Sequence, residues 1–364
     1  MSERGQRGRR GLTGAGLTAL SLSIVFNVAT MASISVVAAE TEGPVSFEGK
    51  TITVDVSTTP GGGYDFYARL LARYLPRHLA GAPAIVVRNV PGAGGIVLAN
   101  NLYNLAPKDG TEIAAFEGGT PFTSFLNGAS VKFDAAKFGW LGSLDKFVPM
   151  VLTWATKPIY SFEDLKTTEM SVGGSGAGSS TSGYPYALNA FLGTRIKVIN
   201  GYPGSAEVAL ALERGELDGY SSWCWDCLKR EKPQWLADKK VRVLLQLSFD
   251  GDPELTAMGV PTMRDVVKTE EQAKMMSIVL AAANFGRPFA APPGLAPPVL
   301  AEWRRAFEAT ARDPGLLAEL KAANGSIRFA APDVIEKLLA TVDTLDAPTL
   351  ARLQAAYSGS GQER

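Results

Sequence analysis

The sequence predicts an α/β protein built of two lobes with a ligand cleft between them. Short β-rich runs alternate with helical segments, which is typical of βαβ units with mostly parallel sheets. This alternation pauses at 140–156 and then restarts, which indicates a second α/β unit. Several glycine-rich turns also follow strand-like runs and precede helices. Because such turns gather at the carboxyl ends of parallel strands, they favour a binding cleft there.

The first α/β unit contains three strand-like runs separated by two helical segments. In the helical segments, apolar residues recur at the spacing of one helix face. The predicted elements are, in order, 50–57, 64–79, 84–90, 95–105 and 111–117.

The second unit repeats the same rhythm. Its predicted strands are 170–176, 195–202, 216–222 and 241–248, and its predicted helices are 184–192 and 205–214. From about residue 270 the pattern is largely helical, with a proline-rich break at 291–298. We expect this last stretch to return to the first lobe. Lobe 1 is therefore predicted at 40–146 plus 247–364, and lobe 2 at 147–246.

The composition excludes several classes of function. The 364 residues contain 36 Lys+Arg and 36 Asp+Glu, and this zero net charge argues against binding of nucleic acid, which needs a basic face. One His and two Cys are too few for Ser-His-Asp chemistry or a zinc site. We therefore expect no metal, no cofactor and no enzyme activity.

The N-terminus has the pattern of a secretory signal peptide. Four arginines precede an uncharged stretch that ends in small residues at Ala39, before Glu40. We predict cleavage between these two residues, and a mature protein that is soluble and periplasmic. A permanent membrane anchor is the alternative, since the stretch is long enough to span a bilayer. The adjacent Arg9 and Arg10 leave the twin-arginine route open beside the general secretion route.

The turn PGGGYD, residues 60–65, joins the first predicted strand to the first helix. Glycines let the backbone approach a ligand, and the free N–H groups of a helix start favour an anion. The turn lacks both G-x-G-x-x-G and the Gly-Lys-Ser/Thr of a phosphate loop, and Asp65 would repel a phosphate dianion. Asp65 is predicted to hold the turn. A plain β–α turn without ligand is the alternative.

Three further segments have the same strand, glycine turn and helix pattern. They are NVPGAGGIVLANNL (89–102), VGGSGAGSSTSGYPYAL (172–188) and INGYPGSAEVALALERGELDG (199–219). Because they fall in both lobes, their loops would face one cleft. Backbone N–H groups and hydroxyls there would hold a small anion without an arginine.

These segments, together with GVPTMRDV later in the chain, resemble the solute-binding receptors of tripartite tricarboxylate transporters, the Bug family. The resemblance covers about 49–357. It implies a periplasmic binding protein of type II, the Venus-flytrap architecture, that captures an organic carboxylate and delivers it to membrane permease subunits. We expect a monomer with no catalytic residues.

The resemblance also implies which residues bind the ligand. These are Pro60, Gly61, Gly62, Gly63, Tyr64 and Asp65 in the first loop, Gly119 and Thr120 after the 111–117 strand, Ser175, Gly176, Ser179 and Ser180 in the facing loop, Tyr202, Pro203, Gly204 and Ser205 at another helix start, and the acidic residue Asp218. The chain departs from the family at Tyr186, Ala187 and Leu188, where many members have a His-Leu pair. The carboxylate class therefore transfers better than the identity of the ligand.

The stretch WCWDC contains a C-x-x-C pair, Cys224 and Cys227. In an exported protein we expect a disulfide that stiffens a turn, worth at most about 2 kcal/mol on the entropy model. A redox-active pair and two free thiols are the alternatives. Trp223 and Trp225 flank the pair. They either pack as core or form an aromatic wall for a ligand bulkier than a small dicarboxylate, and Trp223 is the one that we expect to bind the ligand.

Three remaining features have simple interpretations. Glu117 ends a strand that points at the cleft, where it could accept a hydrogen bond from a ligand amine or hydroxyl; otherwise it is a solvated strand end. His78 lies near a helix C-terminus and is expected to have no function there. The mixed-charge run 229–232 is expected to be a solvated face.

Three rival functions stay open at this point. An exported enzyme is disfavoured because no base–nucleophile pair is visible. A ligand sensor that feeds a signalling partner would have the same sequence features as a transport receptor. A thiol oxidoreductase would act through Cys224 and Cys227.

Overall fold

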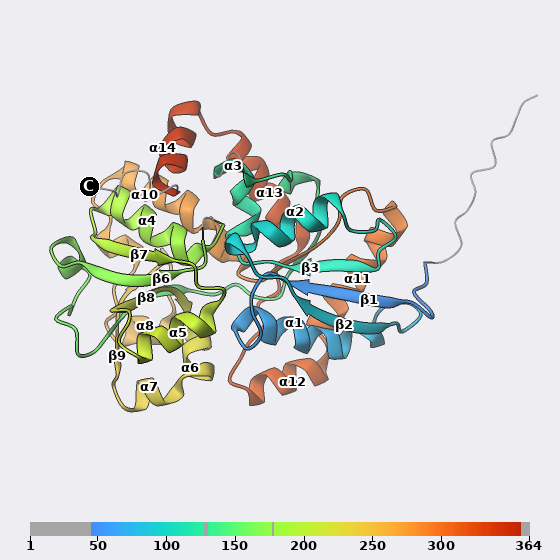
Figure 1. The fold of residues 1–364 in the computed structure, drawn as a ribbon, viewed down its shortest axis with the longest axis horizontal. Helices are drawn as coiled ribbons and strands as arrows, with labels where there is room; N and C mark the ends of the chain where they lie inside the picture. The colour runs from blue at the N-terminus through green and yellow to red at the C-terminus, as the bar shows by residue number, and fades with distance from the viewer. Residues whose placement is uncertain (1–44, 127–129, 177, 358–364) are drawn as a thin grey trace, which may run out of the picture. The chain divides into compact units, whose positions relative to one another are not determined.

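The computed structural model describes residues 45–126, 130–176 and 178–357. The predicted signal peptide, 1–39, and its cleavage site lie outside these residues. The described chain forms two five-stranded sheets covered by helices, which confirms the predicted α/β fold (Figure 1). In these described ranges, no helix combines the length and the apolar character needed to cross a membrane.

The first sheet, sheet A, has the strand order β2-β1-β3-β10-β4. Its strands are β1 (Thr51–Val56), β2 (Ala84–Asn89), β3 (Glu112–Ala115), β4 (Gly139–Ser143) and β10 (Pro288–Ala291). β1 is parallel to both β2 and β3, as expected for βαβ units. β10 is antiparallel to β3 and to β4, so a late segment of the chain completes the sheet.

Alternating side chains of sheet A supply two apolar layers. Ile113 and Ala115 of β3 pack with α1 (Gly63–Tyr74) and α11 (Pro297–Ala311). Ala114 points to the opposite layer, which includes α2 (Ile96–Asn104) and α13 (Pro332–Asp343). α12 (Pro314–Ala322) lies beyond α1 (Figure 1).

The second sheet, sheet B, has the strand order β7-β6-β8-β5-β9. Its strands are β5 (Pro149–Trp154), β6 (Met170–Gly174), β7 (Ile196–Asn200), β8 (Gly219–Cys224) and β9 (Val241–Gln246). β6 is parallel to β7 and β8, whereas β5 is antiparallel to β8 and β9. The helices that follow its parallel strands are α4 (Ser180–Leu192), α5 (Ser205–Glu213) and α6 (Trp225–Glu231), and α7 (Pro233–Ala237) comes next.

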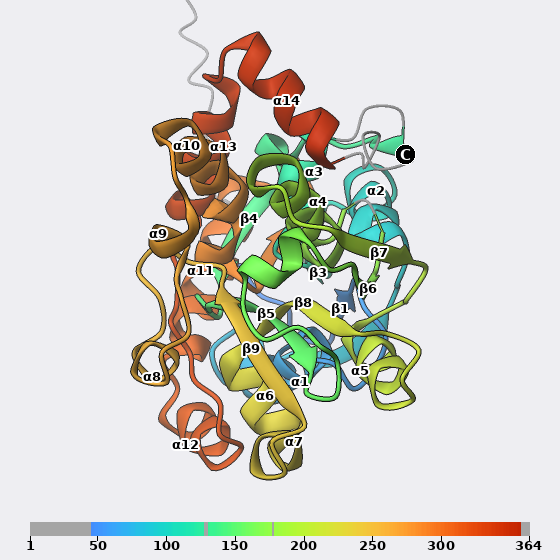
Figure 2. The same cartoon turned by 90° about the vertical axis from the view of Figure 1, so that its left-hand side faces the viewer.

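Two helices from late in the chain pack against sheet B's helix α4. They are α10 (Glu270–Leu280) and α14 (Ala347–Tyr357), and both lie beside α4 in Figures 1 and 2. The short helices α3 (Thr123–Leu126), α8 (Pro253–Ala257) and α9 (Met263–Val266) complete the described set. The predicted lobe boundaries stay a prediction, and part of the segment 247–364 contacts the second sheet.

The structure contains strands that the sequence did not predict in two places. The pause at 140–156 contains β4 and β5, one strand of each sheet. The stretch predicted to be largely helical contains β10, a strand of four residues that begins with a proline. These strands were missed because their sequences do not alternate between apolar and polar residues. β4 and β10 are buried on both faces, as central or covered strands are.

Candidate ligand-binding site

A cavity with a volume of about 50 Å³ lies where strands of both sheets end. Thr58 follows β1 and Glu117 follows β3 of sheet A, while Ser175 follows β6 and Cys224 ends β8 of sheet B; all four line the cavity. The carboxyl ends of parallel strands from two sheets therefore face one space, which is where open α/β sheets bind ligands.

Three helices begin at this cavity. Gly63 of α1, Ser180 of α4 and Ser205 of α5 all line it, and each is the first residue of its helix. The starts of α1 and α5 are in close contact, because a Cβ atom on Gly62 would lie 2.5 Å from Oγ of Ser205. The N–H groups and dipoles of three helix starts create a region that favours an anion.

Hydroxyl groups surround these helix starts. Oγ of Ser222 donates to Oγ of Ser180 at 2.7 Å, and Oγ of Ser175 lies 3.2 Å from Oγ1 of Thr181. Oγ1 of Thr58 is buried and has no hydrogen-bond partner among the described residues. A buried hydroxyl without a partner loses free energy, so Thr58 is available to a ligand in this cavity.

A second cavity, of about 190 Å³, adjoins the first and shares Glu117 and Ser175 with it. Its other walls come from the glycine-rich loops at 91–94 and 201–203, and from Ser57. Glu117 therefore lies between the two cavities and, among the described residues, is the one charged side chain that lines the second.

The glycine loops of the two sheets touch through their backbones. The N–H group of Gly178, in the loop before α4, donates to the carbonyl of Ala93 at 3.3 Å. A Cβ atom on Gly178 would lie 2.6 Å from the carbonyl oxygen of Gly94, and one on Gly94 would lie 2.4 Å from the nitrogen of Ser179. Gly94 also has a φ of 64°, in the region that favours glycine. Glycine is required here because two main chains meet.

The carboxyl group of Glu117 is buried and poorly satisfied. The residue is 3% exposed, and its Oε1 atom has no hydrogen-bond partner. Burial raises the pKa of Glu117 to about 8. The backbone around it is fixed, because its N–H group donates to Oγ of Ser57 at 3.0 Å and the next N–H group, of Gly118, donates to Oη of Tyr64 at 3.0 Å. Burial, and then the charge of Glu117, raise the pKa of Tyr64.

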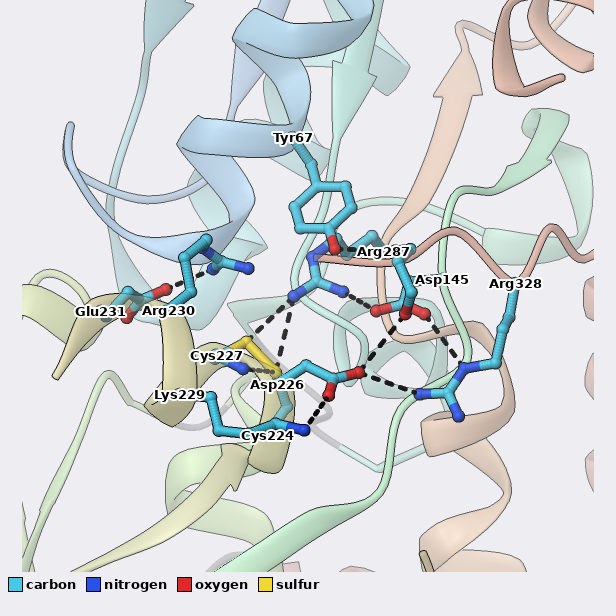
Figure 3. Close-up of a disulfide and its surroundings, with 11 residues drawn as sticks. Tyr67, Asp145, Cys224, Asp226, Cys227, Lys229, Arg230, Glu231, Arg287 and Arg328 are labelled. Atoms are coloured by element: carbon cyan, nitrogen blue, oxygen red, sulfur yellow. Dashed lines mark hydrogen bonds and ion pairs between the residues drawn. A yellow bond between two sulfur atoms is a disulfide. The ribbon is translucent and has the colours of Figure 1, made fainter. Parts of the chain in front are cut away.

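A disulfide joins Cys224 and Cys227 at the wall of the first cavity, which confirms the bridge expected from the sequence. Arg287, which directly precedes β10, contacts it: Nη2 lies 3.1 Å from Sγ of Cys227 (Figure 3). Nη1 of Arg287 donates to Asp145, and the guanidinium lies 3.9 Å from the ring centroid of Tyr67. Arg287 also lines the cavity, and it was not foreseen from the sequence.

The mixed-charge run at 229–232 is not a solvated face, which corrects the sequence-based interpretation. The side chains of Arg230 and Glu231 are only 9% and 19% exposed, and their Nη2 and Oε1 atoms lie 2.5 Å apart. Arg230 lies over the rings of Phe66 and Tyr67 of α1, at 4.7 and 5.6 Å from their centroids. Glu231 lines the first cavity. The aromatic partners come from a distant part of the sequence, so the run alone could not reveal them.

The structure brings eight of the predicted ligand-binding residues to the two cavities. The residues that line them are Gly63, Tyr64, Ser175, Ser180, Ser205 and Trp223 for the first, and Ser175 and Tyr202, with Pro203, for the second. The other predicted residues line neither cavity. All of them except Asp218 lie in the same loops as the residues that do. They are Pro60, Gly61, Gly62, Asp65, Gly119, Thr120, Gly176, Ser179 and Gly204.

Asp65 holds the first glycine turn, as expected. Its Oδ2 atom accepts the N–H group of Gly61 at 3.0 Å, and Arg69 pairs with the same carboxylate at 2.9 Å. Asp218 lies elsewhere, just before the start of β8, where it accepts hydrogen bonds from Ser171 and pairs with Lys157. The C-terminal end of β8, at Cys224, lines the cavity, whereas Asp218 lies at the N-terminal end of this strand.

The aromatic and histidine residues are also placed. Trp223 is buried, stacks on Tyr220 with 4.8 Å between ring centroids, and still lines the first cavity, so it is both core and wall. Trp225 is buried, and its Nε1 donates to Glu254. His78 pairs with Asp313 at 2.8 Å and lines neither cavity. In the described ranges, no cluster of three or more His, Cys, Asp or Glu side chains is placed to bind a metal ion.

Solved structures share this fold. MatC from Rhodopseudomonas palustris with bound malate matches with a TM-score of 0.65 at 20% identity, over 84% of this chain and 98% of that one. The periplasmic binding protein BugD matches at 0.66 and 20%, over 85% and 97%. R. palustris Rpa4515 with adipate matches at 0.64 and 19%, over 85% and 97%. No protein-family model matches the sequence, and no curated protein matches it.

These neighbours agree with the resemblance seen in the sequence, because MatC, BugD and a TctC solute-binding protein from Polaromonas are among them. The chain therefore has the two-lobed α/β fold of the periplasmic binding protein BugD and of MatC.

Proposed function

We propose that this protein is a periplasmic receptor that captures an organic carboxylate and delivers it to a membrane permease of the tripartite tricarboxylate type. One observation carries the proposal: three helix starts, from α1, α4 and α5, converge on one cavity between the carboxyl ends of two sheets. Such a cavity suits an anion, and it holds no nucleophile–base pair among the described residues.

The carboxylate would lie in the first cavity. Backbone N–H groups at Gly63, Ser180 and Ser205 would donate to it, with the unpartnered hydroxyl of Thr58. Hydrogen bonds to a charged acceptor are roughly twice as strong as neutral ones, and exclusion of water strengthens them further. Arg287 also lines this cavity, but its charge is already paired with Asp145, so the helix starts and hydroxyl groups are the main donors.

Two further observations support the proposal. Proteins of the same fold have been solved with malate and with adipate, both carboxylates. The loops of the two sheets touch at Gly94 and Gly178, which would enclose a ligand once bound. The enclosed, ligand-bound form would then have a surface that a membrane partner can recognise.

Isothermal titration with malate, adipate and other dicarboxylates tests the proposal. We expect at least one to bind, and to change the fluorescence of Trp223, which lines the cavity. Thr58→Val should weaken this binding by about 10- to 100-fold, the value of one hydrogen bond to a charged group. Thr341→Val is the matched control, because its exposed hydroxyl donates within α13. A folded protein that binds no carboxylate would refute the proposal.

Delivery to a permease is tested separately. In cells that lack this protein, uptake of the bound carboxylate should fall, and it should be restored only when both the protein and a tripartite permease are present. Full uptake without the permease, or a response of a sensor kinase instead, would favour a signalling receptor.

A further inference from the structure

The buried charges beside the first cavity are paired, with one exception. Asp145 is paired with Arg287, and Glu231 with Arg230. Glu117 has no such cation, and its Oε1 atom is buried without a hydrogen bond. Because burial of an unpaired polar group costs free energy, this carboxyl group calls for a partner that the described chain does not supply.

The position of Glu117 shows where that partner would lie. Of the residues that the structure describes, Glu117 is the one charged group that lines the second cavity, whose remaining polar side chains are Ser57, Ser175 and Tyr202. The helix starts and Arg287 line the first cavity. The first cavity therefore has a cation, Arg287, beside Glu231 and Glu117, whereas Glu117 is the one charged residue described at the second. Glu117 lies at the junction of the two cavities.

Protonation of Glu117 would not by itself satisfy the hydrogen-bonding capacity of its two carboxyl oxygens. In the empty site burial keeps Glu117 protonated near neutral pH, and a protonated carboxyl group offers one donor while it retains unsatisfied acceptor sites. An ammonium group offers three donors and a full positive charge. It would satisfy both oxygens and stabilise the ionised carboxylate.

We propose that the ligand is a carboxylate that also carries a protonated amine, and that Glu117 binds this amine. The inference rests on the proposed function, since the carboxylate end of the ligand would occupy the first cavity. The distance between the two ends of the ligand is then set by the junction of the cavities, and a second carboxylate at the amine position is rejected by like charge.

The other titratable groups around Glu117 would not change their protonation state when an amine binds near neutral pH. They are Tyr64 of α1, Tyr220 of β8, Tyr202 before α5, Glu231 of α6 and Arg287 before β10. Burial raises the pKa of each of the three tyrosines, so they stay neutral up to pH 9. Arg287 stays charged, and Glu231 already has Arg230 as its partner.

Matched pairs of probes test the proposal in the unmodified protein. Adipate is compared with 6-aminohexanoate, and malate with L-aspartate, by titration calorimetry at pH 7 in two buffers of different ionisation enthalpy. We expect the amine-bearing member of at least one pair to bind ten or more times more tightly. Its binding should release close to one proton, because a carboxyl group with a pKa of about 8 must ionise to bind a cation.

Glu117→Gln tests the residue itself. The amide keeps the shape but loses the charge, so affinity for the amine-bearing probe should fall at least tenfold and the proton release should vanish. Glu112→Gln is the matched control, since burial also raises the pKa of Glu112, on the strand that Glu117 follows, but that residue lies near Arg88, outside both cavities. The control should retain both the affinity and the proton release.

Three results would overturn the proposal. If adipate or malate binds more tightly than its amine partner and releases no proton, Glu117 acts as a neutral donor to a second carboxylate. If Glu117→Gln binds the amine-bearing probe unchanged, Glu117 does not contact it. If no carboxylate of either kind binds the folded protein, the proposed function fails together with this inference.

Discussion

Arg287 contacts Cys227, with Nη2 of the guanidinium 3.1 Å from the disulfide sulfur. The arginine directly precedes β10 of sheet A, and the cysteine lies in α6, which follows β8 of sheet B. The contact extends into a chain of charges, because Arg287 pairs with Asp145, and Arg328 lies 3.5 Å from Asp145 and 3.7 Å from Asp226 (Figure 3). Alternating charges thus connect the two sheets beside the cavity.

Removal of the Arg287 charge should destabilise the protein. Arg287→Met leaves Asp145 buried, with only the longer contact to Arg328. A buried charge that loses its partner typically costs about 3–5 kcal/mol, so the free energy of unfolding in urea should fall by about that amount. Asp145→Asn added to Arg287→Met should recover part of the loss.

The exposed pair Arg264–Asp250 is the control for this experiment. Its side chains are 67% and 84% exposed, so Arg264→Met should change the free energy of unfolding by at most about 1 kcal/mol. Equal losses in the buried and the exposed pair would show that the Arg287 contact is not a stabilising one.

Loss of the disulfide should cost little. The bridge closes a ring of only four residues, and the entropy model gives at most about 2 kcal/mol. Sγ of Cys224 also caps α6 by accepting the N–H group of Cys227 at 3.0 Å. Serine is a good N-cap, so the double variant Cys224→Ser, Cys227→Ser should keep that cap. Urea unfolding with and without a reductant measures the loss, and a drop beyond about 4 kcal/mol would contradict this account.

A methyl group at the junction of the loops should prevent their contact. Gly178→Ala places a Cβ atom 2.6 Å from the carbonyl oxygen of Gly94 and 2.9 Å from that of Ala93, and backbone atoms cannot rotate away. We expect at least tenfold weaker carboxylate binding with nearly unchanged thermal stability.

Gly62→Ala offers the contrast. Its Cβ atom would meet only the rotatable Oγ of Ser205, so Ser205→Gly in the same chain should restore any lost affinity. Normal affinity in Gly178→Ala would show that the two loops need not touch when ligand is bound.

Stability should fall as pH rises because of Glu117. Burial raises the pKa of this carboxyl group from 4.5 to about 8, so between these pH values the folded protein holds a proton that the unfolded chain has lost. The stabilising contribution of this group is complete below pH 4.5 and is lost progressively as pH approaches 8. The loss is at most about 5 kcal/mol.

Urea unfolding at pH 5 and pH 9 measures this effect. Glu117→Gln cannot titrate, so it should gain stability relative to the unmodified protein as pH rises. An identical pH dependence in both proteins would show that the carboxyl group is not isolated from water.

Much of the fold could be predicted from the sequence. The parallel strands and the helices after them show local periodicity, and the structure places them within a few residues of the expected bounds, except that α4 begins at Ser180 rather than 184. The helix starts were recognised because glycine turns mark them. β10 was missed because four residues beginning with Pro288 carry no periodic signal.

The site was predicted less completely, for a physical reason. Arg287 and Glu231 reach the cavity only because β10 and α6 are placed by distant segments, and a charged residue in a sequence gives no sign of its burial. Glu117 could be anticipated, since it ends a strand that faces the cleft. That it has no partner is a property of packing, which the sequence does not contain.

The late position of β10 also determines the order in which the chain can fold. All strands of sheet B lie between residues 149 and 246, so this sheet can form as soon as that segment is free to fold. Sheet A needs Pro288–Ala291 between two strands made much earlier, and its β4 edge cannot pair before they arrive. Because non-local pairing slows folding, we expect sheet B to gain protection from hydrogen exchange first, and the binding cavity to appear only with the last step.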